Sequence, residues 1–130
     1  MIVVDASCVV ELLLRSQLGL AIARRMGALN AEFCAPALID IEACLVIRKH
    51  WLAGAITAVR GREAIADLAS LQLERYSHAK LLPSIWQWRS NLSAYDAAYV
   101  ALAEALDAPL ATCDKKLAAA VGGKILVEVF

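Results

Sequence analysis

The chain has 130 residues, of which 61% are hydrophobic and 20% are charged, and its formal net charge is zero. This length fits one domain that buries its own core, so we expect a single domain over residues 1–130. No uncharged apolar stretch approaches the length of a membrane span and no signal peptide is visible, so we expect a cytoplasmic protein with no membrane partner.

Short apolar strands alternate with helical stretches in the first third of the chain. A strand over Ile2–Asp5 is followed by a helix over Cys8–Arg15, with Ser7 as its candidate N-cap. A second helix is expected over Leu18–Leu29. The next strand, Glu32–Pro36, ends at its proline.

The longest helix we expect, Ala37–Leu52, carries an acidic residue among its apolar positions. Glu42 has apolar residues one turn before it and one turn after it, at Leu38, Ile39, Leu45 and Val46. Its carboxylate therefore projects from the apolar face and needs a partner, a proton or a metal ion. Asp40 points elsewhere on the helix, and we expect it to be a solvated acid of the first turn.

The segment after this helix contains two further helices and one strand. We expect a helix over Thr57–Leu71 with Thr57 as N-cap, an edge strand over Leu73–Tyr76 and a helix over Ala79–Ser90. Trp86 and Trp88 are two residues apart and cannot share a helix face, so we expect one in the core and the other at an interface.

The last third completes the alternation. Ser93 is the candidate N-cap of a helix that continues to Leu106. A strand over Leu110–Cys113, a helix over Lys115–Val121 and a strand over Ile125–Val129 come next. The alternation predicts an α/β fold, a three-layer α/β/α domain with a mostly parallel central sheet.

Four acidic residues stand where local packing would favour other side chains. Asp5 and Asp114 each end an apolar strand, Glu42 interrupts an apolar helix face, and Asp96 lies in the first helical turn after Ser93. Taken alone, Asp96 could be a capping acid that offsets the helix dipole. Because ligands of parallel α/β sheets bind at the carboxyl ends of the strands, the topology can bring all four carboxylates together.

Four clustered carboxylates repel one another, and Mg²⁺ or Mn²⁺ removes that conflict because these cations prefer carboxylate and water oxygens. Such a site suits phosphodiester hydrolysis. Without these four acids, 9 acidic residues face 13 basic ones, a balance of +4 that suits a polyanionic substrate. Phosphate-binding glycine loops and a nucleophilic serine elbow are absent, and His50 and His78 have no evident partners.

The four cysteines form no C-x-x-C pair and no zinc-binding spacing; they are Cys8, Cys34, Cys44 and Cys113. In a protein without an export signal, such cysteines are typically reduced. We therefore expect mostly buried free thiols.

Four motifs in this order resemble the PIN-domain ribonucleases, and most closely the VapC toxins of toxin–antitoxin systems. They are Asp5-Ala6-Ser7, Pro36 with Glu42, Tyr95-Asp96-Ala97-Ala98-Tyr99, and Thr112-Cys113-Asp114. The resemblance covers the whole chain and implies a PIN-like fold. It also implies a toxic Mg²⁺- or Mn²⁺-dependent endoribonuclease that leaves 5′-phosphate ends.

The resemblance also implies roles for individual residues. It makes both catalytic residues and metal ligands of the four acids Asp5, Glu42, Asp96 and Asp114. Ser7 and Thr112 match hydroxyl positions that hold carboxylates or water, although N-capping and strand-end turn bonding remain open for them. Arg89 and Asn91 are candidates for contact with substrate phosphate, with simple surface solvation as the alternative. Lys115 and Lys116 stand where many relatives have a further acid or an asparagine.

The partners implied are RNA, a second copy of the chain in a homodimer, and a cognate VapB-like antitoxin. The mean hydropathy of +0.61 independently suggests apolar helix faces covered by a partner. The candidate helices are Leu18–Leu29, Ala37–Leu52 and Thr57–Leu71. The alternative function is a non-catalytic Mg²⁺-binding α/β module, either an inactive PIN-like scaffold or a receiver-like switch.

Overall fold

A five-stranded, entirely parallel sheet forms the centre of the molecule. The structure, a computed structural model, describes residues 1–130. The strands lie in the order β3-β2-β1-β4-β5. Their bounds are β1 Ile2–Val4, β2 Phe33–Pro36, β3 Leu73–Tyr76, β4 Leu110–Thr112 and β5 Val127–Val129. Central strand β1 pairs with β2 through Val3 and Cys34 and with β4 through Val3 and Leu110.

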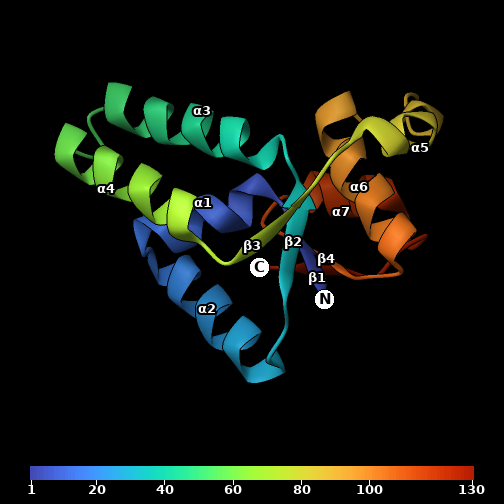
Figure 1. Ribbon diagram of the computed structural model, residues 1–130, viewed down its shortest axis with the longest axis horizontal. Coiled ribbons are helices and arrows are strands. Elements are labelled where there is room, and N and C mark those ends of the chain that lie inside the picture. The colour runs from blue at the N-terminus through green and yellow to red at the C-terminus, as the bar shows by residue number, and fades with distance from the viewer.

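Helices cover both faces of this sheet. Their bounds are α1 Ala6–Leu14, α2 Gln17–Leu29, α3 Ile39–Leu52, α4 Ala58–Ser70, α5 Leu82–Gln87, α6 Ala94–Leu106 and α7 Lys115–Val121, with a short 3₁₀ turn at Ala79–Leu81. In Figure 1, α1 to α4 lie on one side of the strands and α5 to α7 on the other. Right-handed crossovers explain this division, because the chain moves outward in one direction from β1 to β3 and in the other from β4 to β5.

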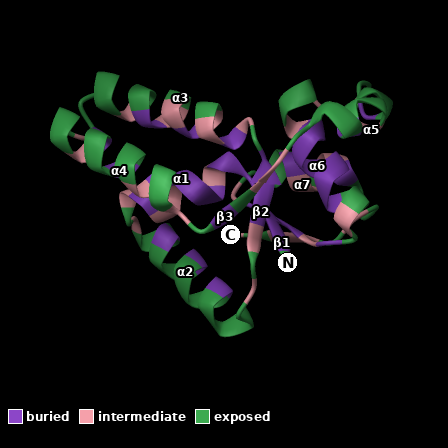
Figure 2. Ribbon diagram, viewed as in Figure 1, coloured by how far each residue is buried: buried purple, intermediate pink, exposed green.

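The core lies between the helix layers and the sheet, and it is centred on strands β1 and β4. Every residue of β1 and β4 is buried, as both faces of a parallel sheet require. Helix α6 adds an unbroken buried run from Ala97 to Ala103 and contacts β1, β2 and β4. Figure 2 shows this burial along the strands and α6, whereas the outer parts of α3 and α4 are largely exposed. Helix α6 is therefore held rigidly against the sheet.

The α/β architecture and the parallel sheet expected from the sequence are confirmed, with differences at several ends. The first helix is capped by Asp5 rather than Ser7, because the Asp5 side chain accepts the Cys8 amide proton. The last strand begins at residue 127 rather than 125. The helix expected over residues 79–90 is a 3₁₀ turn followed by the six-residue α5. Trp88 is 5% exposed and Trp86 67% exposed, so one is in the core and the other on the surface.

Asp40, in the first turn of α3, is exposed to solvent as expected, with a side chain 41% exposed, and it also forms an ion pair. The guanidinium Nε of Arg75, on β3, donates to both carboxylate oxygens of Asp40 at 2.9 Å. The pairing was invisible in the sequence because it joins two elements 35 residues apart. Asp40 therefore ties α3 to the edge of the sheet and leaves Glu42 as the acid of this helix that faces the protein interior.

Large apolar side chains are exposed on the three helices expected to contact a partner. They include Leu20 on α2, Ile41 and Leu45 on α3, and Val59 on α4. No single helix is long and apolar enough to cross a membrane; only α1 and α2 taken together pass by length and composition, and they meet at a bend of 108°. These three helices thus carry exposed apolar surface, and so do α5 and α6 on the other side, through Leu82, Trp86 and Tyr95.

Candidate active site

The sheet topology brings the four acidic residues to one edge. Strands β1 and β4 are neighbours whose following helices cover opposite faces of the sheet, and ligands of such sheets typically bind at the carboxyl ends of the strands beside this switch point. Asp5 follows β1, and Asp114 lies two residues after the end of β4. Glu42 is in the first turn of α3, which follows β2, and Asp96 is in the first turn of α6.

Asp5 is held by two hydroxyl groups that reach it from different segments. Ser7 donates to Asp5 Oδ1, and Thr112, 107 residues away in the chain, donates to Asp5 Oδ2. Each hydroxyl also accepts a backbone N–H at 2.9 Å, from Cys113 and Asp114 respectively. Ser7 and Thr112 therefore clamp the Asp5 carboxylate to the loop between β4 and α7.

Asp114 lies in the same loop, directly before the first residue of α7. Its Oδ1 accepts the amide protons of Lys116 at 2.7 Å and Leu117 at 3.1 Å, which makes it the N-cap of α7. Its Oδ2 accepts no hydrogen bond from the protein. The capping bonds fix the carboxylate in place and leave one oxygen available for a ligand.

Glu42 is held from the opposite helix layer. The hydroxyl of Tyr99, on α6, donates to Glu42 Oε2. Burial raises the pKa of Glu42, the Tyr99 bond lowers it, and the nearby Asp96 and Asp5 carboxylates raise it further. Oε1 of Glu42 has no protein donor. The expectation that this carboxylate needs a partner is met in part by Tyr99.

Asp96 lies on the first turn of α6, whose N-cap is Ser93 as expected from the sequence. Burial raises the pKa of Asp96, a hydrogen bond with Ser93 lowers it, and the charge of Asp114 raises it. Burial also raises the pKa of Asp5, its three hydrogen bonds lower it, and Asp114 raises it. Asp5, Glu42 and Asp96 therefore each lie near the negative charge of at least one other acid of the group.

The donor chemistry of this group fits a hard cation. None of the four acids forms a salt bridge with lysine, arginine or histidine. Neighbouring carboxylates without a compensating cation are the environment that Mg²⁺ or Mn²⁺ stabilises. As the side chains stand, no three His, Cys, Asp or Glu groups lie close enough to hold one ion together. Mg²⁺ sites commonly use one or two carboxylates and several waters, so this spacing is compatible with such an ion.

The basic and polar candidates lie on the surface beside α6 and α7. Arg89 and Asn91 are exposed in the turn before α6, and the Arg89 guanidinium lies 5.0 Å from the centroid of the Trp86 ring. Lys115 and Lys116 are exposed directly after Asp114 and form no salt bridge. None of these residues is buried in the acidic group.

The four cysteines are free thiols in the structure. Two of them lie beside the acidic group: the sulfur atoms of Cys8 and Cys113 are 3.6 Å apart. Burial raises the pKa of the Cys113 thiol, and it also raises that of Cys8. Both groups are therefore protonated at neutral pH and poor ligands for a hard cation.

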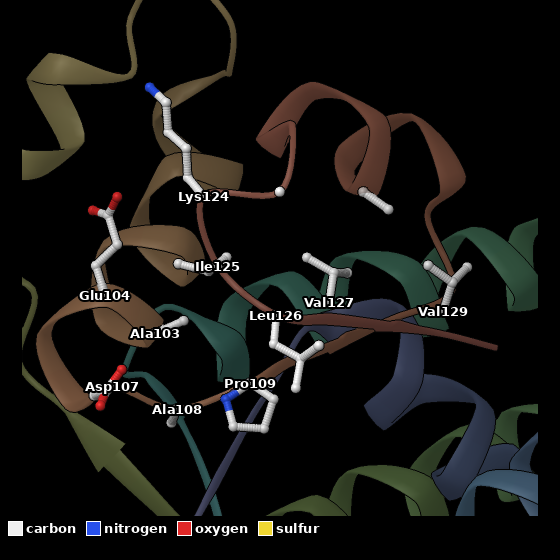
Figure 3. Close-up of a pocket in the computed structure, with 12 residues that line it drawn as sticks. Ala103, Glu104, Asp107, Ala108, Pro109, Lys124, Ile125, Leu126, Val127 and Val129 are labelled. Atoms are coloured by element: carbon white, nitrogen blue, oxygen red, sulfur yellow. The ribbon is translucent and has the colours of Figure 1, made fainter.

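A surface hollow of about 910 Å³ lies at the other edge of the sheet, where α6 ends and β4 begins. Figure 3 shows Glu104 and Lys124 at its rim among mainly apolar residues. Glu104 already accepts hydrogen bonds from Ser84 at 2.8 Å and from the Trp88 indole at 3.3 Å. The hollow is thus separate from the acidic group and holds no comparable set of side chains.

Tyr99 is the residue of this site that the sequence reasoning did not identify. It stands three residues after Asp96, at the helical spacing that places two side chains on one face. That spacing within Tyr95-Asp96-Ala97-Ala98-Tyr99 was the available signal.

Comparison with known proteins agrees with the fold. The PIN domain family matches residues 2–123 of the chain. Ribonuclease VapC12 of Mycobacterium tuberculosis is 37% identical over 129 residues, which cover 99% of this chain and 98% of the relative. Ribonuclease VapC1 of the same organism is 41% identical over 122 residues, 92% of this chain and 90% of the relative.

Two solved structures share the fold at lower identity. FitAcB from Neisseria gonorrhoeae superposes with a TM-score of 0.68 and 17% identity, covering 98% of this chain and 96% of that one. PAE2754 from Pyrobaculum aerophilum gives a TM-score of 0.64 and 23% identity, covering 97% and 89%. With a family match over nearly the full length, the chain belongs to the PIN domain family, among the members that resemble the VapC ribonucleases.

Proposed function

We propose that the protein is the toxin of a toxin–antitoxin pair, an endoribonuclease that depends on Mg²⁺ or Mn²⁺. The observation that carries the proposal is the group of four carboxylates at the switch point, which repel one another and have no cationic partner. The names of the relatives, which are ribonucleases, support the reaction class. An ion bound here would supply an activated water and neutralise charge on the leaving oxygen.

Asp5, Glu42, Asp96 and Asp114 are the proposed metal-holding and catalytic residues. Glu42 Oε1 and Asp114 Oδ2 accept no protein hydrogen bond and are therefore open to an ion or a bound water. Asp5 is oriented by Ser7 and Thr112, which fix the direction of its carboxylate before any ligand arrives. The residues of the chain thus prearrange the carboxylates, and this spares part of the entropic cost of assembling the site.

RNA approaching this edge of the sheet would meet exposed cations at its rim. We propose that Arg89 and Asn91, in the turn before α6, contact substrate phosphates. Lys115 and Lys116 directly follow Asp114 and offset the negative charge of the site toward a polyanion. Because phosphate contacts release counterions, RNA binding should weaken steeply as salt concentration rises.

The test replaces one acid without changing its shape. Asp96→Asn should lower the rate of RNA cleavage by several orders of magnitude, because a neutral amide is a poor ligand for Mg²⁺. Asp107→Asn is the matched control: Asp107 caps the other end of α6 in a left-handed conformation that asparagine also adopts, and its activity should be unchanged. Full cleavage in excess EDTA would contradict the metal dependence. Metal binding without any cleavage of RNA would instead support a non-catalytic Mg²⁺-binding module.

We further propose a homodimer and a VapB-like antitoxin as partners. The exposed apolar residues of α2, α3 and α4 supply surface for both, and a shallow pocket of about 340 Å³ lies between α3 and α4. An antitoxin arginine could make bidentate bonds to the carboxylates and so block the site.

Co-expression with the neighbouring upstream reading frame tests this assignment. Removing the inserted basic residue of the antitoxin should restore cleavage while the two proteins stay bound. A chain that purifies only as a monomer and binds no product of its own operon would contradict it.

A further inference from the structure

We propose that Tyr99 is a positioning residue of this site: its hydroxyl holds Glu42 in the orientation from which Glu42 takes part in metal binding. The inference rests on the proposed function and deepens it. It adds a residue that acts through Glu42 and touches neither substrate nor metal.

The hydrogen bond joins the two helix layers of the molecule. Tyr99 belongs to α6, on one face of the sheet, and Glu42 belongs to α3, on the other. The two residues are 57 positions apart in the chain and meet at the carboxyl edge of the strands. The bond therefore links the helix that carries Asp96 directly to the helix that carries Glu42.

The two partners differ in rigidity, which decides which one positions the other. Tyr99 is 2% exposed and belongs to the continuous buried segment of α6. Glu42 is only half-buried, and its side chain has three rotatable bonds. A rigid phenol thus fixes one carboxylate oxygen of a flexible side chain. The other oxygen, Oε1, stays free of protein donors.

The Tyr99 hydroxyl lies among the acidic side chains of the site. Besides Glu42, the charges of Asp5 and Asp96 act on this hydroxyl. Tyr99 is the only side chain that hydrogen-bonds to the Glu42 carboxylate, which lies near the negative charges of Asp96 and Asp5. The hydroxyl accordingly keeps Glu42 near Asp5 and Asp96.

The experiment compares Tyr99→Phe with a matched variant of the same helix. Phenylalanine keeps the buried ring and removes only the hydroxyl. Tyr95→Phe is the control, because Tyr95 is 64% exposed and its hydroxyl has no partner in the protein. Mn²⁺ affinity is measured on the RNA-free protein by electron paramagnetic resonance. Circular dichroism checks that each variant is folded.

We expect Tyr99→Phe to weaken Mn²⁺ binding by about 10-fold or more, the usual effect of removing a group that orients a ligand. Tyr95→Phe should bind like the unmodified protein. Cleavage by Tyr99→Phe should recover at saturating Mn²⁺, which distinguishes positioning from a role in contacting RNA.

A double-mutant cycle makes the inference specific to Glu42. In a Glu42→Gln background, adding Tyr99→Phe should cause no further loss of Mn²⁺ affinity. Equal affinity of Tyr99→Phe and the unmodified protein would overturn the inference alone, and so would a second full loss in the Glu42→Gln background. Failure of the unmodified protein to bind Mn²⁺ would overturn the proposed function and this inference with it.

Discussion

The hydroxyl of Thr112 offers the sharpest test of how the site is built. Thr112 is fully buried, donates to Asp5 Oδ2 and accepts the amide proton of Asp114 at 2.9 Å. Thr112→Val keeps the shape of the side chain and removes both bonds. The variant therefore leaves a buried carboxylate oxygen and a backbone amide without their partners.

The expected loss comes from these two bonds. A hydrogen bond to a charged group contributes about 1.5–3 kcal/mol and a neutral one about 1 kcal/mol, so the loss should be roughly 2.5–4 kcal/mol. With an unfolding entropy of about 2.1 cal/mol/K per residue, a chain of 130 residues should melt about 9–15 °C lower.

The assay is thermal unfolding of the metal-free protein, followed by circular dichroism. Thr112→Ser keeps the hydroxyl and should lose only about 1 kcal/mol for the missing methyl group. Ser7→Ala should cost less than Thr112→Val, because Ser7 is partly exposed and water can replace its hydroxyl. A melting temperature for Thr112→Val within about 3 °C of the unmodified protein would refute the two-bond reasoning.

Three further outcomes are expected. In the metal-free protein, Asp5, Glu42 and Asp96 have raised pKa values, so the folded state binds more protons than the unfolded state does. The free energy of unfolding should therefore fall as pH rises from about 4 through the raised pKa values of the folded state. Asp96→Asn should flatten that dependence in denaturant titrations and gain less melting temperature from added Mg²⁺; equal shifts would mean that Asp96 does not bind the ion. Gly19→Ala should prevent native packing of α2 on α1, because the added Cβ would lie 2.0 Å from the Glu11 carbonyl oxygen. Gly27→Ala is the control: its added Cβ would have no neighbour within 4 Å, so the melting temperature should stay the same or rise.

Much of the local structure could be predicted from the sequence, because its signals are local. The Ser93 cap and the apolar period after it define α6, and the turn at Gly122 ends α7 within one residue of the expected bound. Alternating strands and helices were enough to indicate a parallel sheet, and the residues directly after the strands of such a sheet gather at one edge. The acidic residues were identifiable because Asp5 and Asp114 end apolar strands, Glu42 interrupts an apolar helix face, and Asp96 begins a helix.

The tertiary structure alone decided how those acids are held. The Thr112 bond to Asp5 spans 107 residues and the Tyr99 bond to Glu42 spans 57, and neither distance leaves a periodic trace in the sequence. The same holds for Arg75, which pairs with Asp40, and for Asp5, which displaces Ser7 as the cap of α1. Local periodicity reports which face a side chain occupies, whereas a hydrogen bond between elements depends on the packing that brings the two faces together.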